Sequence, residues 1–81
     1  MKKLIKFSAS WCQPCKALAG NMKYVDFGDV QVEEVDIDEQ MDKAVSYRVR
    51  GVPTLVLLED GKEVKRQSGV MQAKQLEEFV K

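Results

Sequence analysis

Cys12 and Cys15 are the only cysteines in the 81-residue chain, and two residues separate them. A thiol pair at this spacing can exchange disulfides or bind a soft metal such as Cu(I) or Zn(II). A purely structural disulfide is the weaker interpretation, because closing a loop of about four residues removes only about 2 kcal/mol of unfolded-state entropy. The spacing therefore predicts a reactive or metal-binding pair.

The composition excludes several other kinds of site. The chain has no histidine, which rules out imidazole bases and Cys-His or Ser-His catalysis. Thirteen basic residues balance thirteen acidic ones, so we expect neither nucleic acid nor a membrane surface as a partner. An all-cysteine zinc or iron-sulfur site would need ligands from another chain, and we expect no resident metal. The length suits a single domain over residues 1–81.

The first residues give an expectation about location. The chain begins like a secretory signal, but Lys6, Ser8 and Ser10 interrupt the apolar segment that such a signal needs. In a reducing compartment, closely spaced cysteines are more often catalytic or metal-binding than structural. Because the start of the chain lacks a continuous apolar segment, and because the closely spaced cysteines suit a reducing compartment, we expect a cytoplasmic location.

The pattern of apolar residues predicts the elements that must position the two cysteines. Residues 4–9 form a short apolar strand, and Pro14 stands where a helix can begin, because a first-turn proline gives up only an amide without a partner. The buried face of this helix is expected to consist of Cys15, Leu18, Ala19, Met22 and Val25. A turn at residues 27–29 then leads to a second strand over residues 30–37.

The second half of the chain adds two helices and two strands. Asp38 is expected to cap a helix that ends by Gly51. The apolar face of that helix is expected to consist of Met41, Ala44, Val45 and Val49. A continuous apolar run over residues 52–58 predicts a strand covered on both faces. The Asp-Gly pair at 60–61 predicts a hairpin, and the charged residues 63–68 that follow are typical of an edge strand. A last helix follows, with an inward face of Ala73, Leu76, Phe79 and Val80.

The predicted element order is β-α-β-α-β-β-α. A strand-helix-strand opening implies a right-handed parallel crossover, and the hairpin adds antiparallel strands. We expect an α/β sandwich, in which a four-stranded mixed sheet has helices on both faces. In this arrangement the cysteine pair falls between the first strand and the first helix.

The predicted helix gives the two cysteines different roles. Cys12 precedes it and should be open to solvent, whereas Cys15 lies one turn inside it and should be shielded. A helix N-terminus carries partial positive charge and unpaired amides, which should lower the pKa of the Cys12 thiol. The Cys12 thiolate would attack a substrate disulfide, and Cys15 would then attack Cys12 and release the reduced substrate. This chemistry needs no cofactor, but it needs an external electron donor.

Residues 11–16, Trp-Cys-Gln-Pro-Cys-Lys, resemble the active-site signature Trp-Cys-Gly-Pro-Cys-Lys of the thioredoxin family. Residues 50–54, Arg-Gly-Val-Pro-Thr, are similar to the loop that carries the family's cis-proline opposite the cysteines. The resemblance implies a thioredoxin-like fold and a thiol-disulfide oxidoreductase that reduces protein disulfides, with a thioredoxin reductase or another thiol compound as electron donor. The implied substrate-binding residues are Trp11, Gln13, Pro14, Val52, Pro53, Thr54 and Gly69.

Two departures from the family concern its length and one charge pair. The chain begins later than a typical thioredoxin, so we expect the family's usual first strand and helix to be absent. Thioredoxins keep a buried aspartate six residues before the first cysteine and a lysine on the adjacent strand; here Lys6 takes the acid's position and Glu34 the lysine's. We expect a charge-swapped pair beneath Cys15, with Glu34 as proton acceptor for the resolving step. In the alternative, both charges point to solvent because the shortened fold leaves that side of the sheet uncovered. The apolar neighbours on the strand do not determine which face is covered, so both interpretations stay open.

A second class of function remains open. Small copper-binding modules also place C-x-x-C between a first strand and a first helix, but they run β-α-β-β-α-β, whereas this chain ends in a helix after a hairpin. The acidic run at residues 33–42 lacks the ligand spacing and the central glycine of a calcium-binding loop, so we interpret it as a solvated face. We expect the protein to be a monomer.

Overall fold

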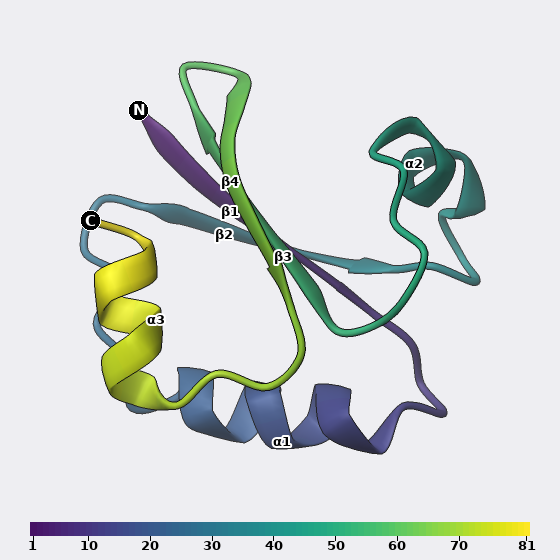
Figure 1. Ribbon diagram of the computed structural model, residues 1–81, viewed down its shortest axis with the longest axis horizontal. Helices are drawn as coiled ribbons and strands as arrows, with labels where there is room; N and C mark the ends of the chain where they lie inside the picture. Colours follow the sequence, from purple (N-terminus) through teal and green to yellow (C-terminus); the bar gives the residue numbers. More distant parts are fainter.

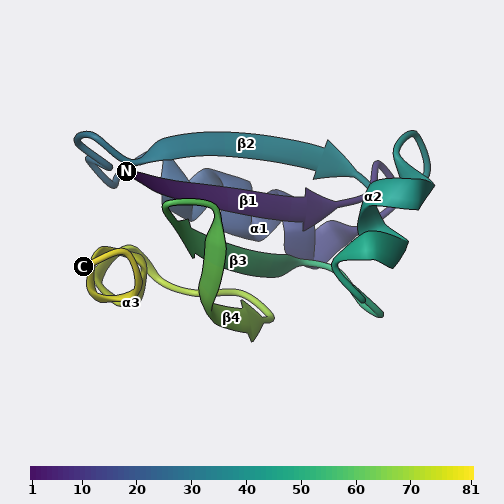
Figure 2. The same ribbon diagram turned by 90° about the horizontal axis from the view of Figure 1, so that it is seen from above.

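The computed structural model describes residues 1–81 as four strands and three helices. The elements are β1 (Lys2–Ser8), α1 (Gln13–Met22), β2 (Gln31–Asp36), α2 (Met41–Ser46), β3 (Thr54–Glu59), β4 (Lys62–Ser68) and α3 (Ala73–Phe79). One sheet has the order β2-β1-β3-β4, in which β2 runs parallel to β1 and the other neighbours are antiparallel. α1 and α3 cover one face of the sheet and α2 covers the other (Figure 1 and Figure 2). This is the predicted mixed α/β sandwich.

The alternation of β1 divides the core between the two faces of the sheet. Leu4 packs with residues of α1 and α3, whereas Ile5 and Phe7 face α2. β3 lies inside the sheet and buries residues 54–58 without interruption, as its continuous apolar run predicts. The first face holds Leu4, Leu18, Leu55, Leu57, Met71, Leu76 and Phe79, and the second holds Ile5, Phe7, Val35, Ala44, Val56 and Leu58.

The C-terminal third follows the sequence prediction closely. The β3–β4 hairpin turns at Asp60 and Gly61, whose φ angles of 52° and 84° suit the turn that an Asp-Gly pair favours. Every residue of β4 is exposed, which fits the predicted edge strand. α3 buries Leu76 and Phe79 against the sheet. None of the three helices combines the length and the apolar character that crossing a membrane requires.

α2 does not begin where the sequence indicates. Its first residue is Met41, and Asp38 forms no cap. Asp36 organises the preceding turn instead, because its Oδ1 accepts the backbone N–H groups of Asp38 at 2.8 Å and of Glu39 at 3.3 Å. This turn delays the helix and leaves the Asp38 carboxylate free for another partner.

The buried face of α2 is also narrower than the sequence predicts. Met41 and Val45 are 63% and 69% exposed, and Val49 lies beyond the end of the helix. A six-residue helix makes fewer than two turns, so it presents only a small contact area to the sheet. Ala44 is the one residue of α2 that is buried there.

Glu33 belongs to an ion-pair network, and the prediction of a solvated acidic face is wrong for it. Its carboxylate contacts Lys3 at 2.6 Å and also Lys43, which links β1, β2 and α2 across the second face of the sheet. Hydrogen bonds from these two ammonium groups, together with their charge, hold the pKa of Glu33 below its ordinary value. The network therefore supports the face that the short α2 covers incompletely.

We expect Glu33→Gln to lower the free energy of unfolding at neutral pH by about 0.5–1 kcal/mol, the scale of partly exposed ion pairs. The pKa of Glu33 is lower in the folded protein than its reference value of 4.5, so the carboxylate stabilises the fold above that value and loses this effect as pH falls through the folded-state pKa. Urea titrations of both proteins at about pH 7 and about pH 3 measure the change. The difference between the proteins should shrink at the lower pH, and an equal difference at both would contradict a role of the charged carboxylate.

Candidate active site

The two cysteines lie at the start of α1. Cys12 is the N-cap residue, with an extended backbone (φ −94°, ψ 108°), and its Sγ accepts the backbone N–H of Cys15 at 3.1 Å. A disulfide joins the two residues, whose Cα atoms are 5.3 Å apart. Gln13 and Pro14 form the exposed first turn between them, where proline costs no helical hydrogen bond. The helix terminus therefore directs a backbone donor at the first sulfur.

The predicted difference in exposure between the two cysteines is wrong for this oxidised state. Cys12 is 4% exposed and Cys15 is 3% exposed. The disulfide holds the first sulfur over the opening turn of α1, and the pair packs against Ala9, Ile37 and Val52. The two sulfurs differ instead in hydrogen bonding, because the Sγ of Cys12 accepts an amide N–H.

The loop before β3 lies against the disulfide. Val52 packs on the cysteine cluster, and the Val52–Pro53 peptide bond is cis. The Pro53 carbonyl accepts the backbone N–H of Gly69 at 2.9 Å, and Gly69 has a φ of 94°, which favours glycine. Thr54 Oγ1 donates to the Gly51 carbonyl at 2.7 Å and braces the loop from its other end. The loop thus places Val52 against the disulfide, whereas Pro53 and Thr54 are buried and Gly69 is tied to the loop by its hydrogen bond to Pro53.

Trp11 precedes the disulfide and is 63% exposed. Its indole Nε1–H donates to Asp38 Oδ2 at 2.8 Å, so the turn before α2 holds the ring in place. A fixed and exposed aromatic ring provides contact area with little side-chain entropy to lose on binding. The sequence alone does not identify Asp38 as a site residue, because an acid after a strand is equally typical of a helix cap.

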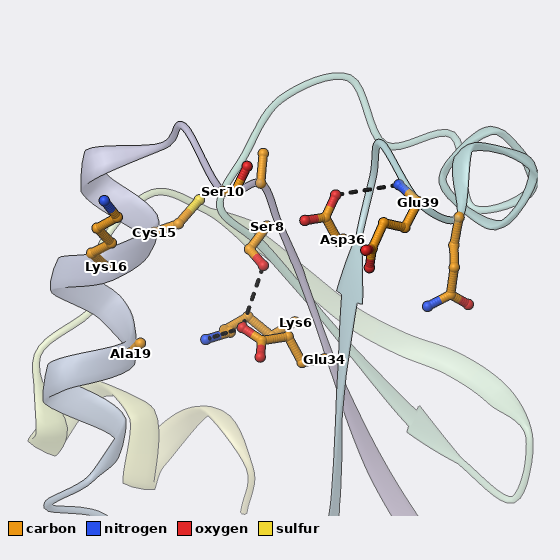
Figure 3. Close-up of a pocket in the computed structure, with 11 residues that line it drawn as sticks. Lys6, Ser8, Ser10, Cys15, Lys16, Ala19, Glu34, Asp36 and Glu39 are labelled. Carbon is orange, nitrogen blue, oxygen red and sulfur yellow. Dashed lines mark hydrogen bonds and ion pairs between the residues drawn. The ribbon is translucent and has the colours of Figure 1, made fainter.

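A polar cleft of about 380 Å³ lies between α1 and the β1–β2 side of the sheet, next to Cys15 (Figure 3). Lys6 lies inside it with only 8% of its side chain exposed, and its Nζ contacts Glu34 Oε2 at 2.8 Å. Glu34 is 62% exposed and also accepts the Ser8 hydroxyl at 3.4 Å. The alternative in which both charges point to solvent is therefore wrong for Lys6. Figure 3 shows the Cys15 sulfur pointing from α1 toward Ser8 and Ser10.

Comparisons with known proteins agree on one family. A family model for thioredoxin matches residues 1–81. Thioredoxin C-2 of Corynebacterium nephridii is 35% identical over 80 residues, which cover 95% of this chain and 74% of that protein. Mitochondrial thioredoxin of Bos taurus is 37% identical over 81 residues and 96% of this chain, although the chain spans only 49% of its length. A solved thioredoxin variant from Halobacterium salinarum has a TM-score of 0.89 and 36% identity, covering 98% of this chain and 71% of that one. The chain belongs to the thioredoxin family.

Proposed function

We propose that the protein is a thiol-disulfide oxidoreductase that reduces disulfides in other proteins. The observation that carries this proposal is the Cys12–Cys15 disulfide at the N-terminus of α1, with a backbone amide directed at Cys12 Sγ and the Val52–Pro53 loop beside it. In the reduced protein, the same amide and the partial positive charge of the helix terminus favour a Cys12 thiolate over the thiol.

The proposed cycle uses only the two sulfurs. The Cys12 thiolate attacks one sulfur of a substrate disulfide, forms a mixed disulfide and expels the other substrate sulfur as a thiolate. Cys15 then gives up its proton and attacks Cys12 Sγ, which forms the Cys12–Cys15 disulfide and releases the second substrate thiolate. Two electrons reach the substrate, and a thiol donor must return two electrons to the protein.

The proposed substrate surface surrounds the disulfide. Trp11, Gln13 and Pro14 are exposed around the start of α1, and Val52 lies against the disulfide. A substrate segment that lies along this loop would bring its own disulfide over Cys12, while the Trp11 ring covers its flank.

Reduction of a disulfide-bonded test protein checks the proposal. Dithiothreitol keeps the protein reduced, and thiols released on the test protein are alkylated and counted by mass spectrometry. We expect turnover well above that of dithiothreitol alone. A rate equal to this background would overturn the proposed function.

Soft-metal binding has less support than disulfide exchange. The chain ends in a hairpin and α3, unlike the copper-binding modules that share the C-x-x-C spacing. Within residues 1–81, no three cysteine, aspartate or glutamate side chains form a group that could hold a metal ion. The two thiols would therefore need ligands from another molecule to complete such a site.

The Lys6–Glu34 pair has a proposed part in the resolving step. Glu34 would accept the Cys15 proton through the cleft that both residues line, and Lys6 would position the carboxylate. We expect Glu34→Gln to slow the resolving step by about tenfold to a hundredfold near neutral pH, because a carboxamide accepts no proton. The difference should vanish at alkaline pH, where the thiol ionises unaided. Stopped-flow measurement of mixed-disulfide decay against pH tests this.

Glu33→Gln is the matched control for that measurement. Glu33 lies next to Glu34 on β2 but contacts Lys3 and Lys43 on the opposite face of the sheet. Its substitution should leave the resolving step unchanged. Identical pH profiles for the wild-type protein and Glu34→Gln would show that Glu34 is not the proton acceptor.

We further propose that the protein acts as a monomer in the cytoplasm, with a thioredoxin reductase or another thiol compound as its electron donor. The Cys12–Cys15 pair must be reduced again after every turnover and therefore needs a reducing compartment, which supports this location. Fractionation of cells that produce the full-length protein tests the location, and sedimentation tests the monomer. Recovery in an organelle fraction would contradict the cytoplasmic assignment.

A further inference from the structure

We propose that the cleft beside Cys15 is a second route to the disulfide, used by a low-molecular-weight aminothiol that reduces the protein at Cys15. This inference rests on the proposed function and names a class of electron donor for it. Of the two cysteines, only Cys15 lines the cleft. Its sulfur points from α1 toward Ser8 and Ser10 (Figure 3). A nucleophile inside the cleft therefore meets the sulfur of Cys15 and not that of Cys12.

The size of the cleft selects for small donors. Its volume of about 380 Å³ lies near the lower end of small-molecule sites, which measure about 300–1,000 Å³. Cys12 and Cys15 are 4% and 3% exposed in total, so little of either residue is open to a large reactant. A thiol compound of a few heavy atoms fits this space, whereas a folded protein must approach from the Trp11 side.

Hydrogen bonding at the disulfide favours attack on Cys15. A thiolate that attacks one sulfur expels the other, and a better stabilised thiolate leaves faster. Attack on Cys15 expels Cys12, whose Sγ already accepts the Cys15 N–H at 3.1 Å at the N-terminus of a ten-residue helix. Attack on Cys12 would instead expel Cys15, which lies inside the first turn.

The charges around the cleft match a thiol that also carries an ammonium group. Lys16 lines the cleft and favours an incoming thiolate, whereas the charge of Lys6 is already matched by Glu34 at 2.8 Å. Glu34, Asp36 and Glu39 line it as well. Glu34 is paired with Lys6, so Asp36 and Glu39 are the carboxylates that attract an ammonium group and repel a second negative charge on the donor. A donor with both a thiolate and an ammonium group meets complementary charge at each end.

Two molecules of the aminothiol complete the reduction. The first thiolate bonds to Cys15 Sγ, the Cys12–Cys15 bond breaks, and its electron pair leaves on Cys12 as a thiolate. The second thiolate attacks the donor sulfur of this mixed disulfide, a donor disulfide departs, and the electron pair remains on Cys15, which takes a proton from water. The protein gains two electrons, and two thiols become one disulfide.

Filling the cleft tests the proposal. Ala19→Phe places a ring in the cleft that Ala19 lines (Figure 3), and Ala17→Phe adds the same ring on an exposed position of the same helix. Reduction of each oxidised protein by cysteamine is followed through the fluorescence of Trp11, the only tryptophan. We expect Ala19→Phe to react about tenfold more slowly than Ala17→Phe, because the ring blocks access to the sulfur. Ala19→Leu serves as a smaller filling group if the phenylalanine variant does not fold.

The outcomes separate this inference from the proposed function. Both phenylalanine variants should form the mixed disulfide with the test protein equally fast, since that step takes place at Cys12 and precedes the resolving step at Cys15. Equal cysteamine rates in the two variants would overturn the inference and leave the proposed function standing. A wild-type protein that fails to reduce the test protein would overturn the proposed function instead.

A comparison of donor charges tests the aminothiol preference. The rate with cysteamine relative to mercaptoacetate should fall by about twofold to threefold in Glu39→Gln at low salt, because one carboxylate of the cleft is neutralised. Glu77→Gln, at an exposed position of α3, is the control and should leave this ratio unchanged. A ratio that Glu39→Gln does not alter would overturn the assignment of an aminothiol.

Discussion

Cys12→Ser should abolish reduction of protein disulfides, lowering the rate by at least about a thousandfold, as loss of a nucleophile does. A serine hydroxyl stays protonated at neutral pH and does not attack a disulfide. Cys15 cannot replace it toward a protein substrate, because it is buried in the first turn of α1 and faces a small cleft. The alkylation count of thiols released on the test protein measures the loss.

Cys15→Ser is the matched comparison, since it makes the same substitution three residues later. This variant keeps the attacking thiolate but has no resolving thiol, so it should accumulate a mixed disulfide with the substrate. The adduct is visible by mass spectrometry without reductant. If Cys12→Ser kept its activity, Cys12 would not be the nucleophile. If Cys15→Ser formed no adduct, Cys15 would not be the resolving cysteine.

Phe7→Ala should lower the free energy of unfolding by about 3–5 kcal/mol, the cost of removing a buried phenylalanine side chain. Phe7 is fully buried on β1 and packs against Tyr47, with ring centroids 5.6 Å apart at an interplanar angle of 56°. A chain of this length has a total stability of about 4–12 kcal/mol, so the loss is a large share of it. Urea titration of the wild-type and variant proteins measures the difference.

Val64→Ala provides the control for that titration. Val64 is 50% exposed on β4, and its truncation should change the free energy of unfolding by no more than about 0.5 kcal/mol. A loss below about 1 kcal/mol for Phe7→Ala would show that the contact between the sheet and the segment after α2 is poorly packed in solution.

The position of the cysteine pair could be predicted because local patterns determine it. Within a helix, Pro14 is tolerated only in the first turn, and the apolar stripe that begins at Cys15 orients that helix against the sheet. The Asp60–Gly61 turn and the buried run of β3 are local signals of the same kind. Where neighbouring residues decide the conformation, the structure follows the pattern.

The features that the sequence does not reveal depend on partners far along the chain. Aspartate is a residue type that often caps a helix, but the carboxylate of Asp38 accepts the indole N–H of Trp11, 27 positions away. Glu33 looks like a solvated acid until β1 and α2 bring Lys3 and Lys43 to it. Charged side chains are alike in a sequence whether they are solvated or paired, and only the tertiary fold distinguishes them.

The hydrogen bond from the Cys15 amide to Cys12 Sγ also bears on the driving force of electron transfer. Reduction turns the Cys12 sulfur, at the N-terminus of α1, from a neutral hydrogen-bond acceptor into an anion. An amide N–H binds an anionic sulfur more strongly. The thermodynamic cycle that links the two redox forms then requires the reduction potential to rise, by about 30 mV for each tenfold gain in stability of the reduced form. A stronger amide contact would make the thiolate more abundant and the protein a weaker reductant.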